Sequence, residues 1–198
     1  MHSRHTTIEV LMDRSALLGL TTGAAVMFSF GVVWLLIGLF RGRPSPAWLR
    51  VTLLITGIAL GGSIATLGLR ASSMPRNPTP LTAQQLATNR SNGQRFYLVF
   101  GIEMAAIFVV VAVLRVIHYA DYILCAIAII VGAHFFPLAP LFGSPVYYAT
   151  ASLGCAIGVV GFFMTDPVRR QKLVGLSFGV LLWATAAWFA WSGLSTAS

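Results

Sequence analysis

The sequence predicts an all-α fold, a polytopic transmembrane helix bundle, on two observations. Apolar residues make up 57% of the chain and charged residues only 9%. The charges border long uncharged runs, of which the longest extends from Tyr122 to Thr165. A bilayer's hydrocarbon core requires about 20 mostly apolar residues for each helical crossing. The short alternating segments of a membrane β-barrel are absent from the sequence, so helices are the expected spans.

Six spans fit the uncharged runs, in a single membrane domain over residues 1–198. The run Phe96–Phe136 contains no proline, and a single helix of that length would extend roughly 60 Å. It must break, and the polar cluster between Arg115 and Asp121 is the expected place because a turn lets these side chains reach water. Prolines between residues 137 and 145 predict the next turn. The expected spans are 15–40, 47–70, 96–115, 119–136, 146–165 and 172–191.

One substantial polar loop is expected, over residues 71–95. Within it, Thr79-Pro80 predicts the start of a short helix that continues to Leu86. Asn92-Gly93 predicts a turn before the third span. The apolar run after Arg14 exceeds the length of a signal-peptide core, so we expect it to be a retained first span.

The distribution of Lys and Arg predicts an orientation. Seven of the 13 lie in the loops after spans one, three and five, and six lie on the other side. We expect the first group to face the cytoplasm, with both termini outside, because these short hairpins concentrate their charge at the membrane surface. The net charge of +8 favours anionic lipid headgroups over nucleic acid, since no contiguous basic domain is present. The expected headgroup contacts are Arg41, Arg43, Arg169, Arg170 and Lys172.

Glu103 is the one carboxylate inside an expected span once Asp121 is assigned to the turn where the fourth span begins. An ionisable residue within the membrane is a functional hypothesis by default. If the third and fourth spans form a hairpin, His134 lies at a depth within roughly 4 to 8 Å of Glu103, so the two can meet directly or through a water. Such a pair suits proton relay or the binding of a small cation or amine. The alternative is a structural glutamate that ties helices together, with His134 at the end of a helix that stops before Pro137.

Arg115, His118 and Asp121 form a second polar group, in which His118 and Asp121 are three residues apart and able to face each other. We favour a solvated turn with local charge pairing over a functional site. The four histidines and two cysteines show no metal-ligand spacing, so neither a metal nor another cofactor is expected.

The run Gly175-Leu176-Ser177-Phe178-Gly179 matches the G-x-S-x-G nucleophile pattern. That pattern requires a turn between a strand and a helix to expose the serine, whereas here it lies within an apolar helix. We therefore do not expect an enzyme.

Glycines four residues apart let membrane helices approach closely. Four expected spans carry such a pair, and their contacts are either within the chain or between copies in an oligomer. The pairs are Gly19 and Gly23, Gly57 and Gly61, Gly154 and Gly158, and Gly175 and Gly179.

The run Phe96–Phe142, with Phe100-Gly101-Ile102-Glu103 and the segment from Ile130 to Ala139, resembles small bacterial multi-pass membrane proteins of uncharacterised function. This resemblance covers about a quarter of the chain. It implies a helix bundle in a bacterial cytoplasmic membrane and supplies no activity.

Two classes of function follow from these patterns. The first expectation is a non-catalytic membrane component, an accessory subunit or lipid-interacting scaffold, with a structural Glu103 in a tightly packed interior. The alternative is a protein that binds or transports a small solute, cation or proton, with Glu103 and His134 facing a cavity. We favour the first because six spans with so few polar groups leave little to line a permeation path.

Overall fold

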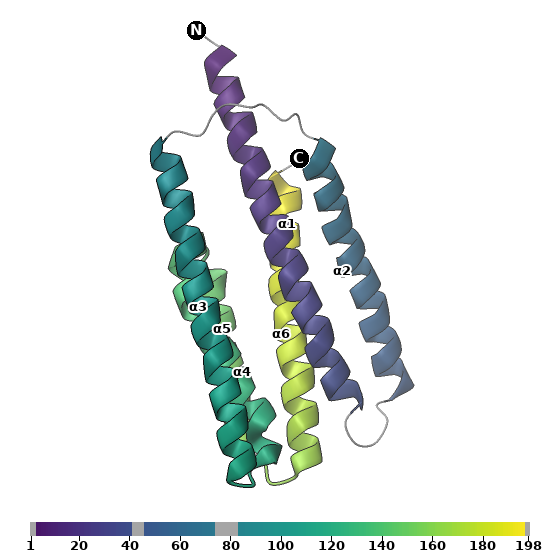
Figure 1. Ribbon diagram of the computed structural model, residues 1–198. Helices are drawn as coiled ribbons and strands as arrows, with labels where there is room; N and C mark the ends of the chain where they lie inside the picture. Colours follow the sequence, from purple (N-terminus) through teal and green to yellow (C-terminus); the bar gives the residue numbers. More distant parts are fainter. Residues whose placement is uncertain (1–2, 41–45, 74–82, 197–198) are drawn as a thin grey trace. The chain divides into compact units, whose positions relative to one another are not determined.

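The computed structural model describes residues 3–40, 46–73 and 83–196, and this part of the chain is all-α, with no strand. Six α-helices and one short 3-10 helix follow one another along it (Figure 1). The expected all-α class is confirmed. The elements are α1 (Ser3–Phe40), α2 (Ala47–Ser73), α3 (Ala83–Val116), η1 (Ala120–Tyr122), α4 (Ile123–Phe142), α5 (Val146–Phe162) and α6 (Pro167–Thr196).

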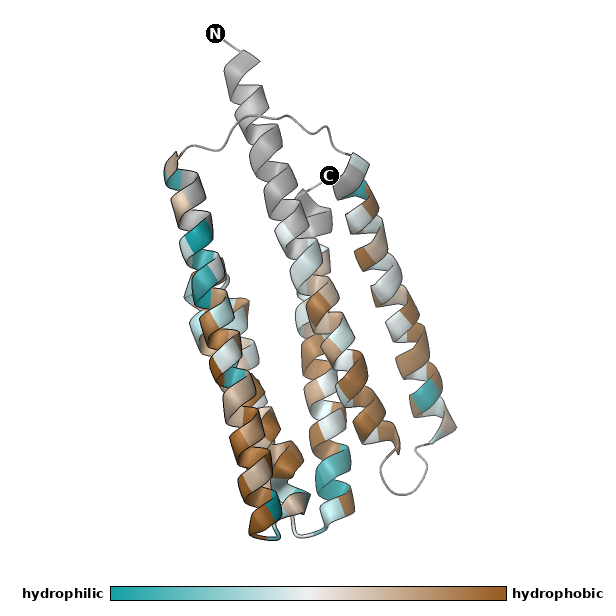
Figure 2. Cartoon of the chain, viewed as in Figure 1, coloured by the Kyte–Doolittle hydropathy of each residue, from teal (hydrophilic) through white to brown (hydrophobic). Residues whose placement is uncertain are grey.

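Five of the described helices contain a segment long and apolar enough to cross a membrane, so the chain has the character of a multi-pass membrane protein. The sixth, α5, is apolar but has 17 residues, at the short end of the range of about 17 to 25 for a membrane helix. Hydropathy changes along α3, which begins with polar residues and becomes predominantly apolar towards its end (Figure 2).

The chain divides into two compact units. One consists of Met1–Val33, Ser45–Thr79 and Leu182–Ser198, and the other of Trp34–Pro44 and Pro80–Leu181. The second unit contains α3, α4 and α5 entire, together with one end each of α1 and α6.

The polar segment before the third span is helical where the structure describes it. Helix α3 begins at Ala83 and passes without interruption through Asn92 and Gly93, so the turn expected at this dipeptide is wrong. No proline follows Pro80 for more than 50 residues, and the intervening Gln, Leu, Ala and Arg side chains are good helix formers. The proposed cap at Thr79 lies outside the described residues.

The break between the third and fourth spans falls where it was expected. Helix α3 ends at Val116, and the amide of Tyr119 then donates to Leu114 O at 2.8 Å while the amide of His118 donates to Arg115 O at 3.2 Å. This is the Schellman arrangement, which requires a left-handed residue, and His118 has φ of 62°. A histidine thus occupies a position that glycine usually fills.

The turn after the fourth span falls within residues 137–145, as expected, but the expected end of that span at residue 136 is wrong. Helix α4 continues through Pro137 and Pro140 and ends at Phe142. Prolines are tolerated in membrane helices when neighbouring groups compensate for the lost backbone hydrogen bonds, and the extra turn buries Leu138 and Ala139. Gly143 caps the helix directly after Phe142, in the left-handed conformation with φ of 62°.

Glycines set the closest approach in the second unit, between α4 and α5. A methyl group added to Gly132 would lie 2.6 Å from Cys155 N, and one added to Gly158 would lie 2.8 Å from Cys125 O. Because these neighbours are backbone atoms, the two helices touch along their main chains, as small residues permit. One of the expected glycine pairs, Gly154 and Gly158, therefore marks a real contact within the chain. Gly132 also takes part in this contact, which the sequence analysis did not predict.

The Gly175 and Gly179 pair packs against α1, also within the second unit. A methyl group on Gly175 would lie 2.7 Å from Gly38 N, and one on Gly179 would lie 2.6 Å from Leu35 Cγ. The glycines of the G-x-S-x-G match are thus explained by helix packing, and Ser177 lies inside α6.

In the first unit, Trp183 fills the space between helices. Its indole N–H donates to Phe28 O at 3.3 Å, and its ring stacks on Phe28 with centroids 5.6 Å apart. A methyl group on Gly57 would lie 2.8 Å from the Trp183 ring. Gly57, from the second expected glycine pair, therefore makes room for an aromatic side chain.

Candidate functional site

The structure brings Glu103 and His134 together. Glu103 lies near the middle of α3 and His134 in the second half of α4, and the hairpin between these helices places them face to face. Oε2 of Glu103 contacts Nδ1 of His134 as an ion pair. The two side chains are only 10% and 11% exposed, so the pair is nearly buried.

Within the described residues, His134 Nδ1 has no partner other than this carboxylate. Nδ1 makes no hydrogen bond to the described residues, so the close contact with the Glu103 carboxylate is the one polar contact found for it between these apolar helices. Removing either Glu103 or His134 would leave a polar group in an environment where an unpaired polar group is costly.

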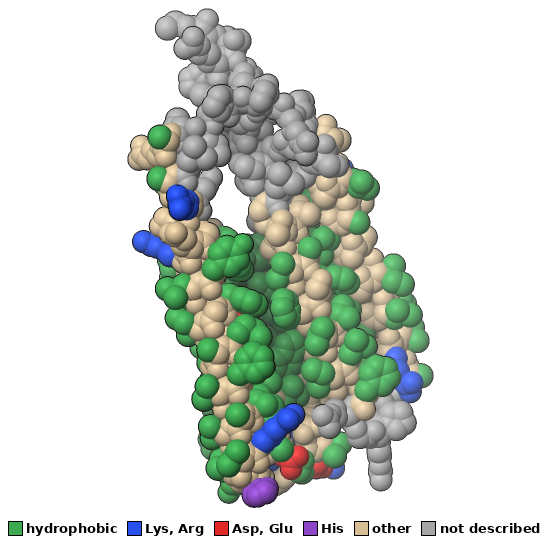
Figure 3. Space-filling view, in the orientation of Figure 1, with side chains coloured by type: hydrophobic (Ala, Val, Ile, Leu, Met, Phe, Trp, Pro, Cys, Tyr) green, Lys and Arg blue, Asp and Glu red, His purple; other side chains and the backbone are tan. Residues whose placement is uncertain are grey.

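Aromatic contacts accompany the pair on the same two helices. The ring of His134 lies 5.4 Å from that of Phe135, and Phe96 of α3 meets Phe142 of α4 edge-on at 6.2 Å. Along the rest of its length α3 is covered mostly by apolar side chains that face outwards, with basic side chains towards its two ends (Figure 3). The ion pair is thus a polar contact within an otherwise apolar interface between α3 and α4.

Two hollows of the described part of the chain lie away from Glu103 and His134. One hollow, of about 400 Å³, follows α1 and is lined by Thr21, Ser29 and their neighbours. Another, of about 360 Å³, lies where α3 ends and is lined by Leu114, Ile117, Tyr119, Tyr122 and Phe162.

The second polar group has Arg115 in the last turn of α3, His118 in the turn that follows and Asp121 in η1, and all three side chains are exposed. His118 and Asp121 were expected to pair, but the described residues show no ion pair among the three. His118 acts instead through its backbone, as the left-handed residue that ends α3.

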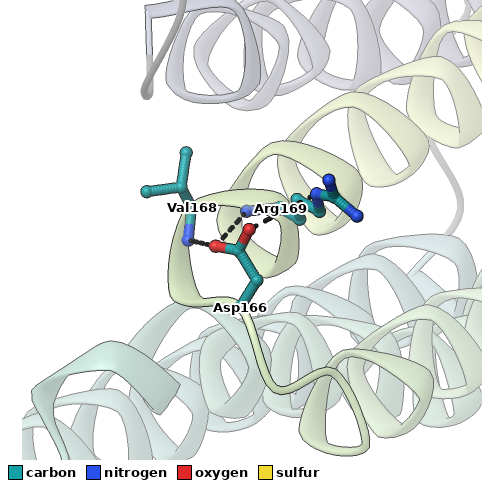
Figure 4. Close-up of polar contacts among 3 residues, drawn as sticks. All are labelled: Asp166, Val168 and Arg169. Atoms are coloured by element: carbon teal, nitrogen blue, oxygen red, sulfur yellow. Dashed lines mark hydrogen bonds and ion pairs between the residues drawn. The ribbon is translucent and has the colours of Figure 1, made fainter.

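Asp166 is a functional capping residue that sequence reasoning missed. Its Oδ1 accepts hydrogen bonds from the amides of Val168 at 2.9 Å and Arg169 at 3.3 Å, while Oδ2 lies 3.3 Å from Arg169 Nε (Figure 4). A carboxylate at this position satisfies free amides at the start of α6 and complements the helix dipole. The signal was present in the sequence, since Asp followed by Pro is typical of a helix start.

Arg170 is the most unusual charged residue of the structure. It was expected to face lipid headgroups, but its side chain is only 2% exposed. Nε donates to Met164 O at 3.0 Å, Nη2 contacts the same oxygen, and the guanidinium carbon lies 3.8 Å from the centre of the Tyr122 ring. Nη1 is buried without a partner among the described residues.

The other basic residues expected at headgroups differ from Arg170. Arg169 is exposed and Lys172 is half-buried. Arg41 and Arg43 lie outside the described residues. Sequence position alone did not distinguish Arg169 from Arg170, because adjacent residues on a helix point in different directions.

Comparisons with known proteins supply no identity: no family model, curated protein or solved structure matches this chain.

Proposed function

We propose that this protein is a non-catalytic component of a membrane, an accessory subunit or lipid-interacting scaffold, in which Glu103 and His134 join two helices. The direct contact between their side chains carries this proposal. Since the carboxylate and the imidazole contact each other between two helices, a structural role accounts for both residues without a substrate.

The packing of the interior also supports this proposal. A permeation path through the second unit would need space along α4 and α5, yet these helices touch along their backbones at Gly132 and Gly158.

We infer that the protein lies in a bacterial cytoplasmic membrane, with the turns after α3 and α5 on the cytoplasmic side and both termini outside. The two turns belong to the same end of the second unit, because Tyr122 stacks on Phe162 and Arg170 lies over Tyr122. Exposed Arg115 and Arg169 at this end agree with the preference of cytoplasmic loops for positive charge.

The orientation is tested with Phe163→Cys in a chain without its native cysteines, because Phe163 is 82% exposed. An impermeant maleimide is expected to label this cysteine only after the membrane is opened.

The function is tested with Glu103→Gln and Glu103→Leu in the full chain, with Asp121→Asn as the control for loss of an exposed carboxylate. A structural role predicts that Glu103→Leu lowers the folded yield and the denaturation temperature, that Glu103→Gln does so to a smaller extent, and that Asp121→Asn does neither. Leucine leaves the His134 imidazole unpaired in an apolar contact, whereas glutamine retains a hydrogen-bond acceptor.

A second candidate is a proton or small-cation carrier, favoured by the contact between an acid and a base within a membrane helix pair. Proteoliposomes loaded with a pH-sensitive dye and held at a membrane potential distinguish the two. The scaffold predicts that the wild-type chain adds no proton flux above that of empty liposomes. Flux that disappears in a well-folded Glu103→Gln variant would overturn the scaffold.

A further inference from the structure

The hollow where α3 ends has a lining suited to an amphipathic ligand. Leu114 and Ile117 contribute aliphatic surface, and the remaining lining residues are aromatic. The rings form a connected group, since Tyr122 lies 5.8 Å from Tyr119 and stacks on Phe162 at 5.3 Å. Its volume of about 360 Å³ falls at the lower end of the range for ligand sites, about 300 to 1,000 Å³.

A buried cation lies directly behind this lining. The Arg170 guanidinium sits over the ring of Tyr122, and among the described residues its hydrogen-bond acceptor is the carbonyl of Met164. Buried charges in proteins are normally paired with an opposite charge. In the described residues no carboxylate forms an ion pair with Arg170, and Asp166 pairs with Arg169 instead.

Basic residues outnumber acidic ones in the segments that end and begin near the hollow. Arg115 is exposed and lies between two lining residues, Leu114 and Ile117, in the sequence. Arg169 and Lys172 add positive charge at this end, against the carboxylates of Asp121 and Asp166. A charge buried in a medium of low dielectric is screened less than one in water, so Arg170 acts on the hollow across the Tyr122 ring.

We propose that this hollow binds one anionic phospholipid, with an acyl chain against Leu114, Ile117 and Phe162 and the phosphate at the rim near Arg115 and Tyr122. Complementarity of charge selects the anionic headgroup, and the apolar lining holds the chain. The proposal rests on the lipid-interacting form of the proposed function and deepens it, because it replaces a general attraction to the membrane surface with one discrete site.

The experiment is native mass spectrometry of the full-length protein in detergent, titrated with phosphatidylglycerol or with phosphatidylcholine of the same acyl chains. One phosphatidylglycerol is expected to remain bound under conditions that remove phosphatidylcholine, with at least a fivefold preference. An excess of inorganic phosphate is expected not to displace it, because phosphate lacks the acyl chain.

Ile117→Trp tests the hollow itself. Ile117 is 50% exposed, so a larger side chain fits without disturbing a packed core, yet it occupies the space that the acyl chain needs. Bound phosphatidylglycerol is expected to fall at least fivefold. The matched control is Val116→Trp, at a neighbouring position that is 76% exposed and does not line the hollow, and it is expected to bind as wild type. Arg115→Gln is expected to reduce the preference for phosphatidylglycerol while the protein stays folded.

Equal binding of the two lipids, equal effects of the two tryptophan variants, or full displacement by inorganic phosphate would each overturn the site. These outcomes are separate from a failure of the proposed function, which would show as proton flux dependent on Glu103.

Discussion

Replacing Gly132 with alanine tests whether the backbone contact between α4 and α5 holds the second unit together. The added methyl group would lie 2.6 Å from Cys155 N and 2.9 Å from Gly154 C, whereas ordinary van der Waals contact begins at 3.4 Å. The helices must therefore separate locally by about 0.8 Å. Overpacking of this kind costs roughly 1 to 3 kcal/mol. Alanine also has the higher helix propensity, by up to about 1 kcal/mol, which offsets part of this cost.

Gly101→Ala is the matched control, because a methyl group there meets nothing within 4 Å. It gains the helix propensity without the clash, so the difference between the two variants isolates the packing cost. For a protein of this size 1 kcal/mol corresponds to about 2 to 4 °C. We expect Gly132→Ala to denature roughly 2 to 12 °C below Gly101→Ala, measured as loss of monodisperse protein after heating in detergent. Equal denaturation temperatures would show that the two helices do not meet at Gly132.

Substitutions at two further positions, Trp183 and His118, probe local features of the fold. Trp183→Phe keeps a ring against Phe28 but loses the indole hydrogen bond, so it is expected to lower the free energy of unfolding by about 0.5 to 1.5 kcal/mol. The control is Trp188→Phe, at a position that is 55% exposed. Equal denaturation temperatures of the two variants in a thermal melt would contradict the role of the hydrogen bond. His118→Gly is expected to stabilise the chain by up to about 1 kcal/mol and His118→Val to destabilise it, because φ of 62° suits glycine and strains a β-branched residue. The reverse order of the two melts would refute a left-handed cap at this position.

The helical class and the hairpin of α3 and α4 were predictable from the sequence because they depend on composition and on charge. In a bilayer, long uncharged runs form helices, because a helix satisfies its own backbone hydrogen bonds. The charged cluster from Arg115 to Asp121 is costly in hydrocarbon, so a turn is expected there. The meeting of Glu103 and His134 followed from the same hairpin, since the position of the turn sets which residues share a depth.

Helix ends were less predictable where packing overrides local preference. Pro137 and Pro140 predict a break, yet α4 continues past them and buries Leu138 and Ala139. Asn92-Gly93 predicts a turn, but nothing nearby forces the chain to reverse there, and α3 continues through it. Such choices depend on neighbours that are distant in the sequence.

Burial of single charges was not predictable at all. Arg169 and Arg170 are adjacent and identical in type, yet one is exposed and the other is covered by Tyr122 and the turn at Met164. Which of them turns inward depends on the rotation of α6, and Asp166 helps to set this rotation by capping the helix and pairing with Arg169.

The structural role of the intramembrane ion pair is the central claim, and a double-mutant cycle tests it most directly. Unfolding free energies of wild type, Glu103→Leu, His134→Leu and the double variant are measured under the same detergent conditions. The account predicts that each single variant is strongly destabilised, because it leaves one buried polar group unpaired, and that the double variant recovers part of the loss, with a coupling of about 1 to 3 kcal/mol. Additive losses, with a coupling below about 0.5 kcal/mol, would contradict it.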